Sequence, residues 1–599
     1  MSNNLRPVKI SKLVLVLAAL VCSPSLGWAE THYVGKGGQY KDIETLRSSG
    51  VLQDGDTIVL NGDDGSLTAP FTNTLTISGK GVISPNSSRQ FFASSSKNIT
   101  IDSDALKFSN FLTTNNGGAI YGNNVTFANG INTFDRNSAR TFGGAIYGGD
   151  WTSGKGSVSF YNGINTFSNN TASDRGGAVV AGNNVILSGG TNTFTNNSAI
   201  SNSSAFGNGG AIYSRNVTLS GGTNTFTGNM ASSTRPASDD SGDGGAIWGL
   251  NVTLSGGTNT FKDNKATGDG GAIYIYWNSN NILTPTLRAT DGDFTFRGNF
   301  DNFGRDTQKA NALYVSSRYH SMSPDIPVQL TLAAHDGQNI YFYDPVTSHS
   351  SYSNAYSAYL TIKINPDSTD TGRVIFDGSD YTKVIDRTSA VYGNTIVGNG
   401  MLGLKGEAIY GAANNVGSFT LGQDAKLVTD GTTNRIQANQ ITLNGLTDVA
   451  NGGTLALAAA AGSYINGTVS LGLGFNDNTS GKVESHATFG KIASFGNLTF
   501  AENTIVNLYW NDTFVPTTNY WSQDYDMTKL FTATGTKTGF EGLYFDTSSF
   551  ADSIFNVSWK SENILTLSYT ANGTVPEPAT LVILGLGLAG LGLARRRRK

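Results

Sequence analysis

Residues 209–229 read GGAIYSRNVTLSGGTNTFTGN, and the chain contains six variants of this segment between Gly117 and Asn299. Each copy opens with Gly-Gly-Ala-Ile or Gly-Gly-Ala-Val and closes on Phe-x-x-Asn. The copies begin 26, 33, 33, 35 and 26 residues apart, at Gly117, Gly143, Gly176, Gly209, Gly244 and Gly270. A period of this length predicts a solenoid in which each copy forms one coil stacked on the last.

The local chemistry of the copies predicts which solenoid forms. Short runs rich in Val, Ile, Thr, Phe and Tyr alternate with Gly, Asn and Ser, which is typical of strands joined by turns. From the closing Asn to the next Gly-Gly there are 6, 6, 12, 15 and 6 residues, so the extra length falls at one corner of the coil. The expected fold is therefore all-β, a right-handed parallel β-helix with three short strands per coil.

Stacking in such a fold places equivalent side chains about 4.8 Å apart. The Phe column is then expected to form an internal aromatic stack, and the Asn column an amide ladder in which each side chain donates to one neighbour and accepts from the other. Paired glycines suit a corner that needs a positive φ or a close backbone approach. The predicted structural ladder consists of Phe134, Asn137, Phe167, Asn170, Phe194, Asn197, Phe226, Asn229, Phe261, Asn264, Phe296 and Asn299.

The alternation of Gly-Gly-Ala-Ile with Phe-x-x-Asn resembles the repeat of the polymorphic outer membrane proteins, a family of autotransporter adhesins. The resemblance covers about a third of the chain and rests on six paired copies. It implies an exported β-helical passenger that adheres to surfaces.

The first 29 residues are expected to be a signal peptide for Sec-type export. Basic residues precede an apolar run from Leu13 to Val21, and cleavage is predicted between Ala29 and Glu30. A lipoprotein signal ending at Cys22 is the alternative. Because Cys22 is the only cysteine, no disulfide or thiolate metal site is expected in the exported part.

Charge argues against a nucleic-acid ligand. Three basic residues lie in 1–29 and five in 595–599, which leaves 32 basic against 44 acidic residues in the rest of the chain. A nucleic-acid-binding protein needs a basic face, and none is visible.

The regions outside the clear repeats are interpreted as follows. Residues 30–100 are expected to hold an N-terminal cap and the first coils, because a solenoid needs its open ends covered. Residues 101–300 form the β-helix with clear repeats, and residues 301–500 continue it as degenerate coils. Residues 501–574, rich in Tyr, Phe and Trp, are expected to form a β-rich cap at the C-terminal end.

The last segment, 575–599, carries the second specific signal. Pro576, Glu577 and Pro578 precede an apolar run over 579–594, which predicts a short transmembrane helix, and the chain closes with Arg595, Arg596, Arg597, Arg598 and Lys599. A plain tail anchor is one interpretation. The combination resembles the PEP-CTERM sorting signal, in which these prolines, the glutamate and the arginines would be read by an exosortase-type membrane enzyme. The resemblance implies a Gram-negative bacterium, an inner-membrane intermediate, and then display at the cell surface, in the outer envelope or in the extracellular matrix.

An enzyme in the same fold is the alternative function, because parallel β-helices also carry polysaccharide lyases and glycoside hydrolases. The chain contains no Gly-His-Gly, and none of its five histidines falls in the six copies. No catalytic residue and no cofactor is therefore predicted.

One acidic pair is a candidate metal site. Asp243 and Asp269 each precede a Gly-Gly and are expected to be stacked neighbours about 5 Å apart. Two carboxylates at this distance repel each other unless water screens them, one is protonated or a cation bridges them. A solvated corner is the first interpretation, calcium bridging helped by Asp239 and Asp240 is the second, and a catalytic carboxylate pair at the separation of a retaining glycosidase is the third.

Together these observations predict a non-enzymatic structural or adhesin-like protein. Exopolysaccharide and cell surfaces are the expected partners, and the membrane is a partner only through the tail before processing.

Overall fold

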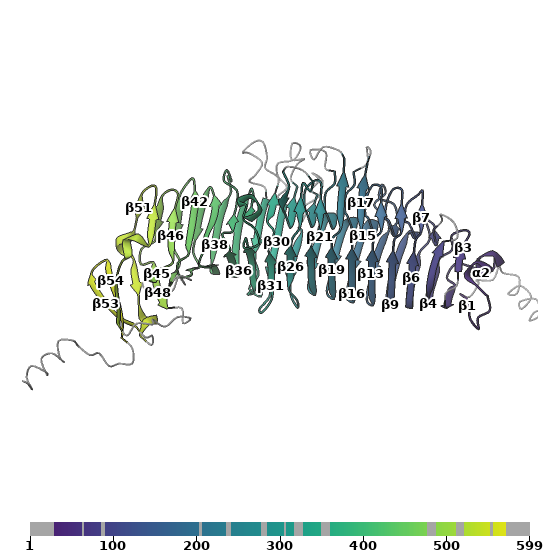
Figure 1. Cartoon of the computed structure of the whole chain (residues 1–599), viewed down its shortest axis with the longest axis horizontal. Helices are drawn as coiled ribbons and strands as arrows, with labels where there is room; N and C mark the ends of the chain where they lie inside the picture. Colours follow the sequence, from purple (N-terminus) through teal and green to yellow (C-terminus); the bar gives the residue numbers. More distant parts are fainter. Residues whose placement is uncertain are drawn as a thin grey trace, which may run out of the picture.

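The computed structural model describes residues 29–570 except 63–64, 86–89, 203–205, 235–240, 277–283, 305–306, 317–327, 349–359, 476–486, 511–519 and 552–554. The chain forms one long β-solenoid, with a short helix at one end and a small sheet at the other (Figure 1). Almost all strand pairs are parallel and join equivalent segments of successive coils. The predicted parallel β-helix is confirmed, while its hand stays a prediction.

Each coil of the repeat region contributes to four parallel ladders, one more than the sequence predicts. Ladder 1 follows Gly-Gly-Ala and contains β5 (Phe92–Ala93), β8 (Ile120–Gly122), β11 (Ile146–Gly148), the first parts of β15 (Val179–Leu187), β18 (Ile212–Leu219) and β21 (Ile247–Ser255), β24 (Ile273–Ile275), β29 (Leu313–Val315) and β32 (Val346–Ser348).

Ladder 2 begins at the N-terminal end and runs through the Asn-Val segments of the repeats. It contains β1 (Thr31–Gly35), β2 (Thr57–Asn61), the first parts of β4 (Leu75–Pro85), β6 (Ile99–Ser109) and β9 (Asn124–Asp135), β12 (Ser157–Phe160), the second parts of β15, β18 and β21, β25 (Thr286–Ala289), β30 (Val328–Ala334), β33 (Leu360–Ile364), the first parts of β36 (Asn394–Lys405) and β38 (Ser418–Thr429), β40 (Gln440–Leu443), β43 (Ser463–Ile465), β47 (Leu498–Phe500) and β51 (Lys537–Thr538).

Ladder 3 carries the Asn-Thr-Phe segments and supplies the aromatic column of the core. It contains β3 (Gly65–Leu67), the second parts of β4, β6 and β9, β13 (Ile164–Ser168), β16 (Thr191–Thr195), β19 (Thr223–Thr227), β22 (Thr258–Lys262), β26 (Phe294–Arg297), β31 (Asn339–Phe342), β34 (Arg373–Asp377), the second parts of β36 and β38, β41 (Leu446–Val449), β44 (Val469–Phe475), β48 (Ile505–Trp510) and β52 (Tyr544–Asp546).

Ladder 4, which the sequence does not predict, consists of very short strands after Phe-x-x-Asn. Its members are β7 (Leu112–Thr113), β10 (Ser138–Ala139), β14 (Thr171–Ala172), β17 (Ser198–Ser201), β20 (Met230–Ser233), β23 (Lys265–Ala266), β27 (Phe300–Asp301) and the antiparallel β28 (Lys309–Ala310). Beyond β32 a separate parallel sheet contains β35 (Thr388–Ser389), β37 (Ile409–Tyr410), β39 (Thr433–Ala438), β42 (Thr454–Ala459), β46 (Lys491–Ser494) and β50 (Phe531–Ala533).

Both ends of the core are covered. At the N-terminal end α2 (Ile43–Ser49) buries Ile43 and Leu46 in the core, and its N-cap Asp42 accepts the N–H of Thr45. At the C-terminal end β49 (Tyr520–Asp526), β54 (Ile564–Thr570) and β53 (Phe555–Ser561) form an antiparallel sheet, and Leu565 and Leu567 are buried. The coils continue as far as β52, so they overlap the region 501–574 that the sequence assigns to the cap alone.

The Phe column is a continuous stack. From Phe108 through Phe134, Phe167, Phe194, Phe226, Phe261, Phe296 and Phe342 to Phe376, successive ring centroids lie 4.8 to 5.1 Å apart with nearly parallel planes. The parallel register fixes this geometry, because a side chain at the same position of each coil must lie over its predecessor.

The asparagines of Phe-x-x-Asn form a buried amide ladder. From Asn137 to Asn299, each Nδ2 donates to the Oδ1 of the next asparagine at 2.9 to 3.0 Å. The same Nδ2 also donates to a phenylalanine carbonyl, and each Oδ1 accepts the backbone N–H of the preceding asparagine as well. Every polar atom of these fully buried side chains therefore has a partner, which makes their burial tolerable.

A carboxylate closes the ladder at its C-terminal end. The two donor groups of Asn299, its backbone N–H and its Nδ2, reach Oδ2 of the buried Asp344 at 2.9 and 2.6 Å. In each amide of the ladder one Nδ2 donor points toward this end, so the negative charge accepts the last donor of the row. Burial raises the pKa of Asp344 to about 6, opposed by hydrogen bonds from Tyr381 and Asn299, so the group is mainly ionised at neutral pH.

A second amide ladder, absent from the sequence-based expectations, lies in Asn-Thr-Phe. Its members Asn132, Asn165, Asn192, Asn224 and Asn259 are fully buried and donate Nδ2 to the next Oδ1 at 2.9 to 3.0 Å. The signal was available, because Asn stands two residues before each Phe of five copies. The ladder ends where Phe294 takes the register position that follows Asn259.

The two glycines of each pair are needed for the two predicted reasons, a positive φ and a close backbone approach. Gly209 has a φ of +68°, in the left-handed region, and a Cβ on Gly210 would lie 2.0 Å from the carbonyl oxygen of Gly245 in the next coil. The first glycine is thus required by conformation and the second by the closeness of the coils.

We predict that Asn197→Ala lowers the free energy of unfolding by about 3 kcal/mol, because it leaves two donors of Asn170 and the carbonyl of Phe167 buried without partners. Thr193→Ala, on the outer face of the same coil, is the matched control and should change it by less than about 0.5 kcal/mol. Urea unfolding of the two variants checks this, and equal stabilities would contradict a structural role for the ladder.

Candidate functional surface

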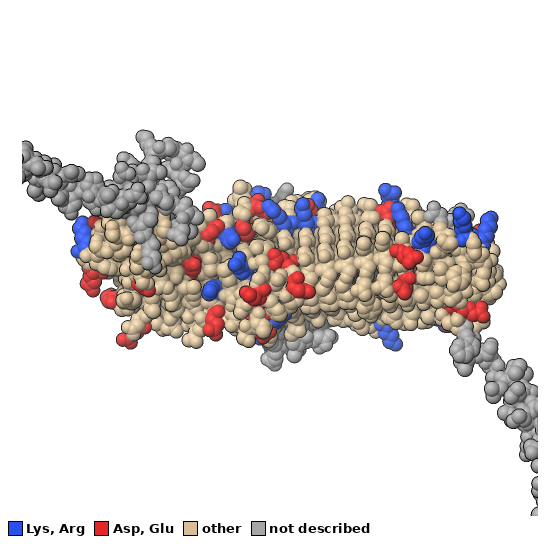
Figure 2. Space-filling view, turned by 90° about the horizontal axis from the view of Figure 1, so that it is seen from below, with Lys and Arg blue, Asp and Glu red and all other residues tan. Residues whose placement is uncertain are grey.

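The outer face of ladder 3 carries a regular row of threonines. Because side chains alternate along a strand, the residue between the two buried side chains of each copy points outward. The threonines of six successive coils are in register in this position, namely Thr133, Thr166, Thr193, Thr225, Thr260 and Thr295. On the side of the molecule shown in Figure 2, a ribbed stretch to the right of the middle, toward the N-terminal end, carries few charged side chains.

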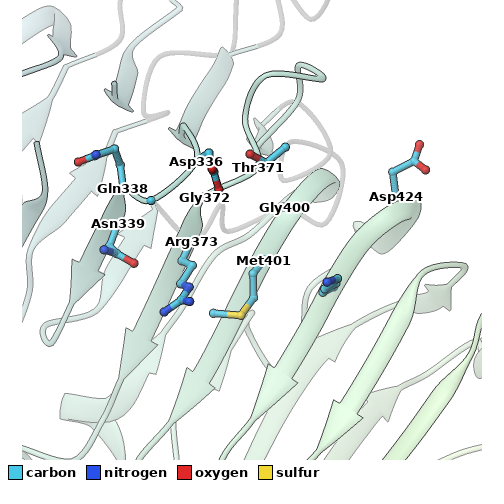
Figure 3. A pocket seen from close by; sticks show the side chains of 11 residues that line it. Asp336, Gln338, Asn339, Thr371, Gly372, Arg373, Gly400, Met401 and Asp424 are labelled. Atoms are coloured by element: carbon cyan, nitrogen blue, oxygen red, sulfur yellow. The ribbon is translucent and has the colours of Figure 1, made fainter. Parts of the chain in front are cut away.

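A groove lies at the C-terminal side of this row, where ladder 2 turns into ladder 3. Its volume is about 500 Å³, and its lining includes Arg373, Met401 and Lys426. These three residues are in register on neighbouring strands β34, β36 and β38. Figure 3 shows Arg373 and Met401 side by side on the floor, with Asp336 and Thr371 above them and Asp424 at the far side.

The two cations of the groove form no direct ion pair, although Lys426 interacts electrostatically with the half-buried Asp448. Arg373 and Lys426 are exposed, and neither side chain makes an ion pair or hydrogen bond within the part of the chain that the structure describes. Of the carboxylates of the lining, Asp336 lies in the turn between β30 and β31, and Asp424 lies on β38, two residues before Lys426. The floor is therefore cationic, with Met401 as an apolar surface between the charges.

The wall of the groove is held in place by an ion-pair network. Arg288 donates to Oδ2 of Asp367 at 2.7 Å and to Oδ1 of the buried Asp370 at 2.5 Å. Asn365 accepts the N–H of Ala334 at 2.9 Å and donates to the carbonyl of Gly372 at 3.1 Å. The turn that carries Thr371 and leads into Arg373 is thus fixed to two coils.

The acidic pair of the sequence analysis has a different role in the structure. Asp243 is buried, and its Oδ1 accepts the backbone N–H of Asp269 at 2.8 Å, while its own N–H donates to Oδ1 of Asn208 at 3.0 Å. The side chain before Gly-Gly thus continues the pattern of coil-to-coil hydrogen bonds. No group of three His, Cys, Asp or Glu that could hold a metal occurs among the residues described. Asp239 and Asp240 lie outside these residues, and calcium binding stays a prediction.

The other predicted sites fall mostly outside the described part of the chain. Residues 575–599, with the expected sorting residues and membrane helix, are not described, and no helix elsewhere in the described residues is long and apolar enough to cross a membrane. At the expected cleavage site, the N–H of Glu30 donates to Oδ1 of Asp56 at 2.8 Å, so the first coil begins there. Of the five histidines only His32 and His335 are described, and each lies beside one aspartate.

An aromatic column on the outer face of ladder 1 was not anticipated. Tyr147, Val180, Tyr213, Trp248, Tyr274 and Tyr314 are in register directly after the buried residue that follows Gly-Gly-Ala. Trp151 packs on Tyr213, and the guanidinium of Arg215 lies 4.9 Å above Trp151. The tyrosine that follows Gly-Gly-Ala-Ile in several copies was the signal for it.

Asp301 is a buried acid that the sequence did not single out. It lies in β27 with its side chain fully buried, 3.6 Å from Nζ of Lys309. Burial raises its pKa to about 8, against the attraction of Lys309 and with a smaller contribution from the charge of Asp269. The carboxyl group is therefore mainly protonated at neutral pH.

We predict that the free energy of unfolding falls as pH rises from about 4 to about 8, because the folded state holds the Asp301 proton more tightly than the unfolded chain, whose carboxyl titrates near 3.8. Asp301→Asn, neutral at every pH, should reduce the difference in stability between pH 5 and pH 8.5 by roughly 1 kcal/mol or more. Urea unfolding at both pH values measures it. A variant with the full wild-type difference would show that Asp301 does not titrate in this range.

Two regions of the chain match models of known protein families. The PEP-CTERM protein-sorting motif matches residues 574–599. The Chlamydia polymorphic membrane protein repeat matches residues 133–149, 166–182 and 260–276, each of which spans a Phe-x-x-Asn and the following Gly-Gly-Ala. No solved structure matches the chain significantly.

Similar whole proteins come from Chlamydia pneumoniae. Probable outer membrane protein pmp8 is 30% identical over 235 residues, pmp13 is 28% identical over 242 residues and pmp2 is 29% identical over 211 residues. These alignments cover 33–37% of this chain and 22–23% of the relatives, so the chain matches less than a quarter of their length. The chain thus carries a PEP-CTERM sorting motif together with repeats of the polymorphic membrane protein type.

Proposed function

We propose that this protein is an exported, non-enzymatic surface protein that supports adhesion or the extracellular matrix. The observation that carries the proposal is the pairing of a sorting motif at 574–599 with polymorphic membrane protein repeats. The relatives are described as probable outer membrane proteins, which supports a place at the cell surface.

The architecture supports a function carried by extended surface. Its buried ladders repeat from coil to coil, and the outer face of ladder 3 repeats with them. A surface of this kind presents the same chemical groups many times along one axis, which suits a polymeric partner. No observation on the described residues favours the polysaccharide-degrading alternative.

Export, sorting and final location follow from the same proposal. The chain passes the inner membrane through Sec-type machinery, stays there as an intermediate, and is read by an exosortase-type enzyme at Pro576, Glu577 and Pro578. Exopolysaccharide and cell surfaces are the proposed partners.

We predict that the mature protein in the envelope or matrix lacks Lys599 and ends near 576–578, whereas a Pro576→Ala/Glu577→Ala variant keeps Lys599 and stays in the inner membrane. Intact mass and C-terminal peptide mapping of each cell fraction check both forms. The control is Pro516→Ala/Glu502→Ala, which carries the same changes away from the motif and should be sorted normally. Wild-type protein that keeps Lys599 and remains in the inner membrane would identify a plain tail-anchored protein instead.

A further inference from the structure

We propose that the groove over β34, β36 and β38 binds one strand of an anionic, β-1,4-linked polysaccharide through the carboxylates of its uronate sugars. The inference rests on the proposed surface function and names the chemistry that would recognise the polymer. Its basis is the order of the side chains on the floor of the groove: a cation, an apolar side chain and a second cation, Arg373, Met401 and Lys426.

The spacing of the cations fits a polymer that lies along the solenoid axis. Adjacent strands are about 4.8 Å apart, so Arg373 and Lys426, two registers apart, are separated by roughly 10 Å along the axis. In a twofold ribbon of β-1,4-linked uronates, alternate carboxylates point to the same side, at a distance close to two strand spacings. Each cation of the floor can therefore meet one carboxylate, with one sugar between them.

The groups between and around the cations suit that intervening sugar. Met401 offers an adaptable apolar surface to the face of the ring. Asp336, in the turn before β31, and Asp424, on β38, can accept hydrogen bonds from sugar hydroxyls, and the amides of Gln338 and Asn339 line the other end of the groove. One Asn339 donor is already used by Oδ1 of Asp293, at 3.0 Å, which fixes the side chain.

The net charge of the chain requires that a polyanion be attracted by a local group of cations. With 32 basic and 44 acidic residues outside the two basic ends, the protein as a whole repels a polyanion. Attraction must come from local cations, and Arg373 and Lys426 are exposed, form no direct ion pair among the residues described and line the same groove. Their neighbours Arg288 and Arg297 are held by Asp367, Asp370 and Asp380.

The test measures binding of the mature protein to a β-1,4-linked oligouronate by calorimetry, with the carboxyl-reduced form of the same oligomer as the neutral ligand. We expect binding to the oligouronate alone, weakened by salt because the charges are exposed. Arg373→Gln/Lys426→Gln should reduce the affinity about tenfold or more. The matched control is Lys41→Gln/Lys491→Gln, which removes two exposed cations outside the groove and should bind like the wild type.

Three results would overturn the proposal. Equal binding of the two double variants would place the polymer elsewhere on the protein, and equal binding of the reduced oligomer would exclude carboxylate recognition. Absence of binding to either oligomer would show that the groove is not a polysaccharide site. The C-terminal mapping of cell fractions would still test the proposed surface function independently.

Discussion

Every coil of the repeat region buries an asparagine whose polar groups are satisfied by the neighbouring coils, through the next side chain of the ladder and a phenylalanine carbonyl. An amide has two donors and an acceptor with two lone pairs, and in Asn170, Asn197 and Asn229 all of them are used. Any slip of one coil would leave several of these groups buried without partners, at a cost of a few kcal/mol. The ladder thus fixes the register of the solenoid, and the Phe stack, the glycine corners and the outer threonines follow that register.

The same constraint explains where the regular structure changes. The first ladder ends at Asp344, whose carboxylate accepts the last donors, and the second ends at Phe294, where the register position becomes apolar. After these positions the coils are held by aliphatic side chains such as Leu402, Leu427 and Leu471. These coils lack the repeat motif, so the side chains on their outer face vary from coil to coil. The groove with Arg373 and Lys426 lies on this face.

This division suggests how scaffold and recognition are separated in the chain. The six regular coils present an even surface with few charges on one side, which is suited to spacing and to weak repeated contact. The later coils offer a groove with charged groups at defined positions, and Arg288 ties its wall to the body of the solenoid. A surface protein of this design would combine a long, regular surface with one binding site of higher selectivity.

The β-helix, the Phe and Asn columns and the glycine corners could be predicted from the sequence, because each rests on a local pattern repeated at one period. The sequence could equally have revealed the second ladder of Asn132 and its equivalents, whose signal stands in the same repeat. The roles of Asp243, Asp301 and Arg373, in contrast, became visible with the stacked coils. Their environments are built by residues from other coils, whose insertions and irregular turns change which groups meet, and no local pattern encodes that meeting. The physical reason is that burial and partner distance, which set the state of a charge, are properties of the stacked coils together.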